Sequence, residues 1–226
     1  MRTVIFLLAF ACALFFCSLI APILVGFAHG EEEQVIQLAV MASTGAFISV
    51  LAMAASFGYR HVVTPNRLIL SMVFVWVGLS LVGTFPFILV LDMPFETALF
   101  ESVSGLTTTG ASTFAAREEL PRSIMFWRLQ MEWTGGFLTL ASLFLVLSPL
   151  AIGGLPRRAM ASEWSMDRTA DRDAGVEHLR RYMPLLAYYL VASVIVFFLY
   201  VASGTDSLGA AYLTMTSIAT GGFNPH

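Results

Sequence analysis

The fold is decided by residues 95–113, FETALFESVSGLTTTGAST, which lie between two long apolar stretches. The first part of this segment carries apolar side chains at Phe95, Ala98, Leu99, Val103 and Leu106. A helix over 95–106 would be about 18 Å long, too short to cross a bilayer core of about 30 Å. We therefore predict that 95–106 is a re-entrant helix, which enters and leaves the membrane on one side and is followed by an irregular loop.

The composition around this segment is that of a membrane protein. Of 226 residues, 58% are apolar and 12% are charged, whereas a soluble domain has about 25% charged residues. The mean hydropathy of +0.80 excludes a soluble globular domain, a disordered chain and a disulfide-stapled secreted fold. Uninterrupted apolar runs favour helices over a barrel. The predicted spans are residues 4–28, 35–58, 68–91, 123–152 and 182–203.

The arginines orient the predicted spans. All twelve basic residues are arginine, and nine of them fall on one side of the membrane if the spans alternate. The positive-inside rule places that side, and the N-terminus, in the cytoplasm. A cleaved signal peptide at 4–28 is the disfavoured alternative, because the apolar run is about twice the usual length and contains Pro22.

A shift of 112 residues aligns the sequence with itself. Residues 106–112, LTTTGAS, lie over 218–224, IATGGFN, and span 68–91 lies over span 182–203. The repeated unit is a span, a re-entrant helix, a loop and a closing span. Both copies enter from the same side, so their pseudo-symmetry axis lies along the membrane normal.

This repeat divides the chain into four predicted parts. They are two leading transmembrane helices (1–62), a first helix–pore loop–helix unit (63–155), a cytoplasmic loop (156–178) and a second unit that stops after its pore loop (179–226).

The loop residues are suited to a dehydrated cation. Threonine offers carbonyl and hydroxyl oxygens, and Gly110 permits backbone angles that turn carbonyls toward an axis. Neutral oxygens favour a monovalent ion, since a divalent ion prefers carboxylates. Close helix packing by Thr, Ser and Gly is the alternative, and two copies in register favour the ion site.

Four motifs resemble one transporter family. They are FESVSGLTTTGAS (100–112), LPRSIMFWRLQMEWTGG (120–136), SPLAIGG (148–154) and SIATGGFNPH (217–226). Together they resemble the pore-forming subunits of the Trk/Ktr/HKT potassium transporters, the TrkH type most closely. That family has four such units around one pore, with two helices in front in the TrkH type. The chain is therefore expected to be an N-terminal portion.

The resemblance implies a potassium-selectivity filter with Gly110 and Gly222 as its key glycines. Potassium would be bound by the carbonyls of Thr108, Thr109, Thr220 and Gly221, with Thr107 and Ala219 completing the two strands.

The resemblance also implies the surroundings of the pore. It implies a multi-pass protein of the bacterial cytoplasmic (inner) membrane, in contact with lipid, and a homodimer in full-length form. A cytosolic nucleotide-binding regulatory subunit of the TrkA type is the implied partner. Potassium would be the substrate, with no covalent cofactor, and a net charge of −3 suggests no nucleic-acid partner.

Three charged residues at membrane depth need a reason, because an intramembrane charge costs about 2.5–3.5 kcal/mol. We expect Glu101 to support the filter, either through a negative field near the outer vestibule or as a hydrogen-bond anchor for the filter backbone. A protonated or solvated residue near the interface is the alternative. Arg128 and Glu132 are four residues apart on one predicted helix, so they are expected to form an intramembrane ion pair. Gly135 and Gly136, like the glycines at 153–154, are expected to be close-packing or flexible points and not ligand loops.

These residues support potassium transport through a carbonyl filter. The alternative is a non-conducting fragment that acts only in assembly with partner chains. An enzyme is disfavoured, because no nucleophile–base pair accompanies Arg128 and Glu132 within the spans.

Overall fold

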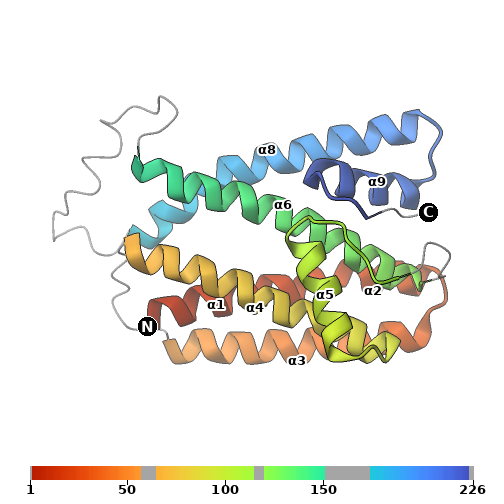
Figure 1. Cartoon of the computed structure of the whole chain (residues 1–226), viewed down its shortest axis with the longest axis horizontal. Coiled ribbons are helices and arrows are strands. Elements are labelled where there is room, and N and C mark those ends of the chain that lie inside the picture. The colour runs from red at the N-terminus through yellow and green to blue at the C-terminus, as the bar shows by residue number, and fades with distance from the viewer. Residues whose placement is uncertain (1, 57–64, 115–119, 151–173, 224–226) are drawn as a thin grey trace.

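The computed structural model describes residues 2–56, 65–114, 120–150 and 174–223 (Figure 1). Every regular element in these ranges is a helix, which confirms the all-α prediction. The helices are α1 (Arg2–Ser18), α2 (Ile20–Ala28), α3 (Glu32–Ser56), α4 (Pro65–Leu91), α5 (Phe95–Leu106), α6 (Arg122–Leu150), α8 (Ala174–Ala202) and α9 (Ser207–Ala219).

The long helices run side by side, and the two short helices α5 and α9 lie against α6 (Figure 1). Helix α1 packs on α3 and α4, α5 packs between α4 and α6, and α9 packs between α6 and α8. The first and second copies of the repeat therefore meet along α6, which closes the first copy.

Four helical segments among the described residues are long and apolar enough to cross a membrane. They are Val4–Ala28, which runs through α1 and α2, and Glu32–Ser56, Ile69–Leu91 and Met183–Ala202. Helix α6, the expected fourth span, has 29 residues but is not among these four. Its first half carries Arg128, Gln130 and Glu132, all buried in the protein.

The first span is broken between α1 and α2, which the apolar run alone did not predict. Proline has no N–H, so Pro22 cannot donate to the carbonyl of Ser18 as a helix would require. The Nε2 of Gln130 donates to the Ser18 carbonyl instead, at 3.0 Å. The break is thereby attached to α6.

The start of α6 is fixed by Glu31, from the turn between α2 and α3. Its Oε1 accepts from the amide of Arg122 at 2.6 Å, and its Oε2 accepts from the amide and hydroxyl of Ser123 at 3.0 and 2.6 Å. A carboxylate at a helix N-terminus satisfies free amides and complements the helix dipole. The two leading helices therefore position the helix against which both short helices pack.

Candidate functional site

The short helices α5 and α9 end in the same backbone conformation. Thr108 and Thr220 both adopt left-handed angles, with φ of 54° and 51°. Left-handed angles are unfavourable for residues with a Cβ, so their occurrence at two positions 112 residues apart supports the internal repeat.

The hydrogen bonds around these threonines repeat as well. After α5, the amides of Thr108 and Thr109 donate to Gly105 and Ser104, both at 2.9 Å. After α9, the bonds at the same offset run from Thr220 to Ser217 and from Gly221 to Thr216, at 3.2 and 3.0 Å. These bonds cap the C-terminal carbonyls of each helix. The 112-residue repeat thus relates backbone geometry as well as sequence.

The two loops touch at the predicted filter glycines. Gly110 has φ of 72°, a value that favours glycine. A Cβ on Gly110 would lie 2.4 Å from the Cα of Gly222, and one on Gly222 would lie 3.3 Å from the Cα of Gly110. The approach at Gly110 excludes any side chain there.

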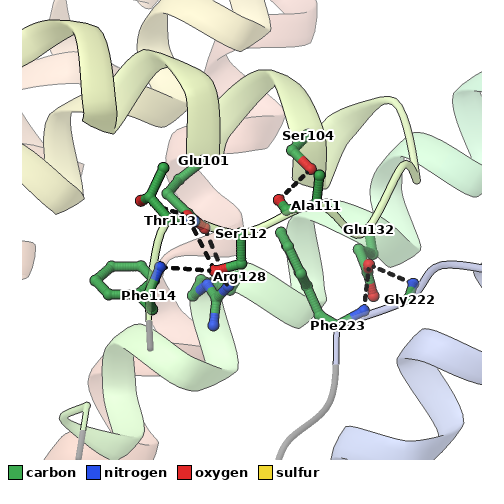
Figure 2. A network of polar contacts seen from close by, with 10 residues as sticks. All are labelled: Glu101, Ser104, Ala111, Ser112, Thr113, Phe114, Arg128, Glu132, Gly222 and Phe223. Atoms are coloured by element: carbon green, nitrogen blue, oxygen red, sulfur yellow. Dashed lines mark hydrogen bonds and ion pairs between the residues drawn. The ribbon is translucent and has the colours of Figure 1, made fainter. Parts of the chain in front are cut away.

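Glu101 ties the first loop to its own helix. The side chain is fully buried, and its Oε1 accepts from the hydroxyls of Ser112 and Thr113 at 3.0 and 2.8 Å, and from the Thr113 amide (Figure 2). The hydroxyl of Ser104 donates to the Ala111 carbonyl nearby. Glu101 and Ser104, both on α5, therefore hold the loop after Gly110 against that helix.

Arg128 pairs with Glu101, so the predicted pair with Glu132 is wrong. The Arg128 Nη2 donates to the Glu101 Oε2 at 3.0 Å and to the Ser112 hydroxyl at 2.8 Å. The guanidinium lies 4.8 and 4.2 Å from the ring centroids of Phe114 and Phe223 (Figure 2). Spacing of four residues made the Glu132 pair reachable, but each charge is directed to a loop instead.

Glu132 holds the second loop. Its Oε1 accepts from the backbone amides of Gly222 and Phe223, each at 3.0 Å (Figure 2). A Cβ on Gly221 would lie 2.4 Å from the carboxyl carbon, so glycine there admits the carboxylate. The Oε2 has no hydrogen-bond partner among the described residues. The sequence signal for this contact was the buried acid on α6 together with the Gly-Gly pair.

Two glycines on α6 admit the ends of α5 and α9. A Cβ on Gly135 would lie 1.7 Å from the Leu106 carbonyl oxygen, and one on Gly136 would lie 3.0 Å from the Cα of Ala219. The predicted close packing at Gly135 and Gly136 is confirmed. The glycines at 153–154 lie outside the described residues.

The other two predicted filter residues, Thr107 and Ala219, lie at the C-terminal ends of α5 and α9. The hydroxyl of Thr107 donates to the Val103 carbonyl at 2.8 Å and lies 2.8 Å from the Thr109 hydroxyl. Ala219 is buried at the end of α9. In the part of the chain that the structure describes, no three His, Cys, Asp or Glu residues are grouped to hold a metal.

Comparison with known proteins gives a consistent match. Residues 38–224 match the family model TrkH, described as a cation transport protein. The chain is 26% identical over 228 residues to the Trk system potassium uptake protein TrkH of Vibrio parahaemolyticus, covering all of this chain and 46% of that protein. It is 30% identical over 159 residues to the protein of the same name from Escherichia coli, covering 70% of this chain and 32% of that protein.

A solved structure shares the fold. The crystal structure of the potassium transporter TrkH from Vibrio parahaemolyticus matches with a TM-score of 0.79 and 25% identity, over 100% of this chain and 44% of that chain. The chain thus spans under half the length of these relatives.

Proposed function

Because the chain belongs to the TrkH family of cation transport proteins, we propose that it supplies two strands of a potassium-selectivity filter. The proposed ligands are the carbonyls of Thr108, Thr109, Thr220 and Gly221. Potassium is the transported substrate, and family membership makes the chain part of a transporter, not an enzyme.

One observation carries this proposal. Two loops 112 residues apart repeat the same left-handed threonine and the same capping bonds, and they meet at Gly110 and Gly222. Simple helix packing requires small residues but does not require this matched loop geometry. Carbonyls arranged in register can replace the water shell of a cation.

The surroundings complete the proposal. The proposed division of the chain is two leading helices (1–62), a first unit (63–155), a cytoplasmic loop (156–178) and a second unit (179–226). The protein is proposed to lie in the bacterial inner membrane with its N-terminus in the cytoplasm. Its proposed partners are a second copy, in the full-length form, and a TrkA-type nucleotide-binding subunit. Because the chain spans 46% of one relative, uptake is proposed for an assembly that supplies the remaining strands.

A non-conducting role in assembly is the second candidate. It is favoured by the share of its relatives that the chain spans, 46% of one relative and 44% of the chain in the solved structure. Two strands form only part of a ring, so conduction by this chain alone would require several copies.

Potassium rescue separates the two candidates. The 226-residue chain and a version extended to the length of its relatives are expressed in bacteria that lack potassium uptake, and growth is followed at low potassium. We expect the extended version to rescue growth, and Gly110→Asp or Gly222→Asp within it to abolish rescue at unchanged expression.

The matched control is Gly30→Asp. Gly30 also has a positive φ, 75°, but a Cβ there would meet nothing within 4 Å. We expect this variant to rescue growth. Full rescue by the filter variants in an active extended chain would overturn the filter assignment. Rescue by the 226-residue chain would contradict the requirement for further strands.

A further inference from the structure

The backbone cap after each short helix fixes the direction of one proposed ligand carbonyl. A trans peptide unit is planar, so its N–H and its C=O point in opposite directions, and no peptide bond of the described residues is cis. The amide of Gly221 donates to the Thr216 carbonyl at 3.0 Å, so the Thr220 carbonyl in the same peptide unit points away from that acceptor. The equivalent cap after α5 fixes the carbonyl of Thr108 in the same way.

The carbonyl of Gly221 is fixed by a side chain instead. It shares a peptide unit with the amide of Gly222, and this amide donates to the Oε1 of Glu132 at 3.0 Å (Figure 2). The Gly221 carbonyl therefore points away from the carboxylate. The next amide, that of Phe223, donates to the same oxygen at 3.0 Å, so one atom orients two successive peptide units. Glu132 thus sets the direction of a carbonyl that the proposed filter uses.

The acceptor is held firmly, and a single oxygen provides it. Glu132 lies in α6 and is fully buried. A Cβ on Gly221 would overlap its carboxyl group, so the loop packs directly against the carboxylate. Its Oε1 accepts both bonds, whereas its Oε2 has no hydrogen-bond partner among the described residues. The orienting contact therefore requires one acceptor oxygen at the reach of a glutamate, and it does not require the second oxygen.

We propose that Glu132 is a positioning residue for potassium selection, whose Oε1 directs the Gly221 carbonyl toward the ion. This inference rests on the proposed function, because it takes Gly221 as a ligand. Filter carbonyls replace the water shell of a cation, and selection depends on the size of the site or on the number of carbonyl dipoles around the ion. Both change when one carbonyl turns away. Loss of the acceptor therefore weakens the preference for potassium over sodium.

Two conservative variants separate the orienting oxygen from the negative charge. Glu132→Gln keeps an acceptor oxygen at the same reach and removes the charge, whereas Glu132→Asp keeps the charge and withdraws the oxygens by one methylene. Each is made in the chain extended to the length of its relatives and expressed in bacteria that lack potassium uptake. The KM for potassium uptake and the sodium concentration that halves the rate are measured.

We expect Glu132→Gln to keep the wild-type sodium sensitivity. Glu132→Asp should raise the KM for potassium several-fold and should be inhibited by several-fold less sodium, because its carboxylate no longer reaches the Gly222 amide. The reverse order, with the aspartate variant selective and the glutamine variant not, would overturn the proposal, since the charge and not the orientation would then decide selection. Wild-type sodium sensitivity in both variants would overturn it as well.

Glu31→Ala is the matched control for a purely structural role. Glu31 also accepts two backbone amides, those of Arg122 and Ser123, but at the start of α6. Its loss should lower the maximal rate with the amount of folded protein and leave the KM and the sodium sensitivity unchanged. If Glu31→Ala changes the sodium sensitivity as much as Glu132→Asp does, selection follows stability and the proposal is overturned.

Gly222→Asp distinguishes failure of this inference from failure of the proposed function. If Gly222→Asp abolishes uptake while Glu132→Asp selects potassium as the wild type does, the filter assignment stands and the positioning role of Glu132 is wrong. If Gly222→Asp transports potassium normally, the filter assignment is wrong and the inference falls with it. Loss of uptake in Gly222→Asp together with loss of selection in Glu132→Asp supports both.

Discussion

The two proposed filter loops share a backbone conformation but are anchored in different ways. The first is held by Glu101 on its own helix, α5, through Ser112 and Thr113. The second is held by Glu132 of α6, the helix that closes the preceding unit. The residue 112 positions after Glu101 is Leu213, so the second helix has no acid at that place.

The difference separates the contacts that both copies of the repeat share from the contacts that differ between them. The caps at Thr108 and Thr220 are local, because they depend on the last turn of each helix. The anchors are long-range and can come from any buried carboxylate within reach of loop amides. Helix α6 therefore serves both units, with Arg128 directed to the first loop and Glu132 to the second.

The largest effect is expected when α5 is given the residue that α9 carries at the equivalent position, Leu213. Glu101→Leu removes three bonds to the loop and leaves Arg128 buried without its partner, which costs about 3–5 kcal/mol. We expect loss of the folded protein or a large drop in its melting temperature in detergent. Glu96→Leu, on the exposed first turn of the same helix, is the control and should melt normally. Equal melting of the two variants would show that the first anchor is not stabilising.

The second anchor is expected to act on its own loop alone. Glu132→Ala leaves the amides of Gly222 and Phe223 without an acceptor, and the amide of Phe223 is buried, which costs about 1–3 kcal/mol. Hydrogen exchange should accelerate in residues 220–223 and stay unchanged in 108–113. Glu132→Gln retains one acceptor oxygen and should exchange more slowly than the alanine variant. Acceleration in both loops would contradict separate anchoring.

The sequence predicted the elements better than it predicted their contacts. The short helix expected over 95–106 is α5, Phe95–Leu106, because the spacing of its apolar residues is a local signal. The break in the first span depends on Pro22 and also on Gln130 of a distant helix. The sequence showed Pro22, but it did not show that Gln130 would donate to the carbonyl that the proline leaves free.

The proposed filter residues were visible in the sequence because they recur, and the contacts that anchor them were not visible because they do not recur. Arg128 and Glu132 were recognised as buried charges on one helix, but their partners lie 27 and 90 residues away. The spacing of residues within one helix does not show whether a charge pairs with a neighbour four residues away or with a residue that is distant in the sequence. Packing decides the partner, since Gly221 leaves room for the carboxylate beside the second loop.

A smaller effect is expected from changing the shape of the shared cation. Arg128→Lys keeps the charge but loses the planar group between Phe114 and Phe223, a contact worth about 0.5–2 kcal/mol when desolvated. We expect a modest fall in melting temperature. Phe223→Leu should destabilise the wild type more than it destabilises the lysine variant. Fully additive losses in this double-mutant cycle would mean that the ring and the guanidinium are not coupled.

The smallest effect concerns the bond that supports the first loop beside its anchor. Ser104→Ala removes the hydroxyl that donates to the Ala111 carbonyl, an interaction worth about 0.5–1.5 kcal/mol. If Glu101 is the dominant anchor, hydrogen exchange in 108–113 should rise only slightly and the second loop should not respond. Ser43→Ala is the matched control, because it removes a bond from a serine hydroxyl to a backbone carbonyl at an exposed position of α3. Exchange in the first loop as fast as in Glu101→Leu would show that the serine, and not the carboxylate, holds this loop on its helix.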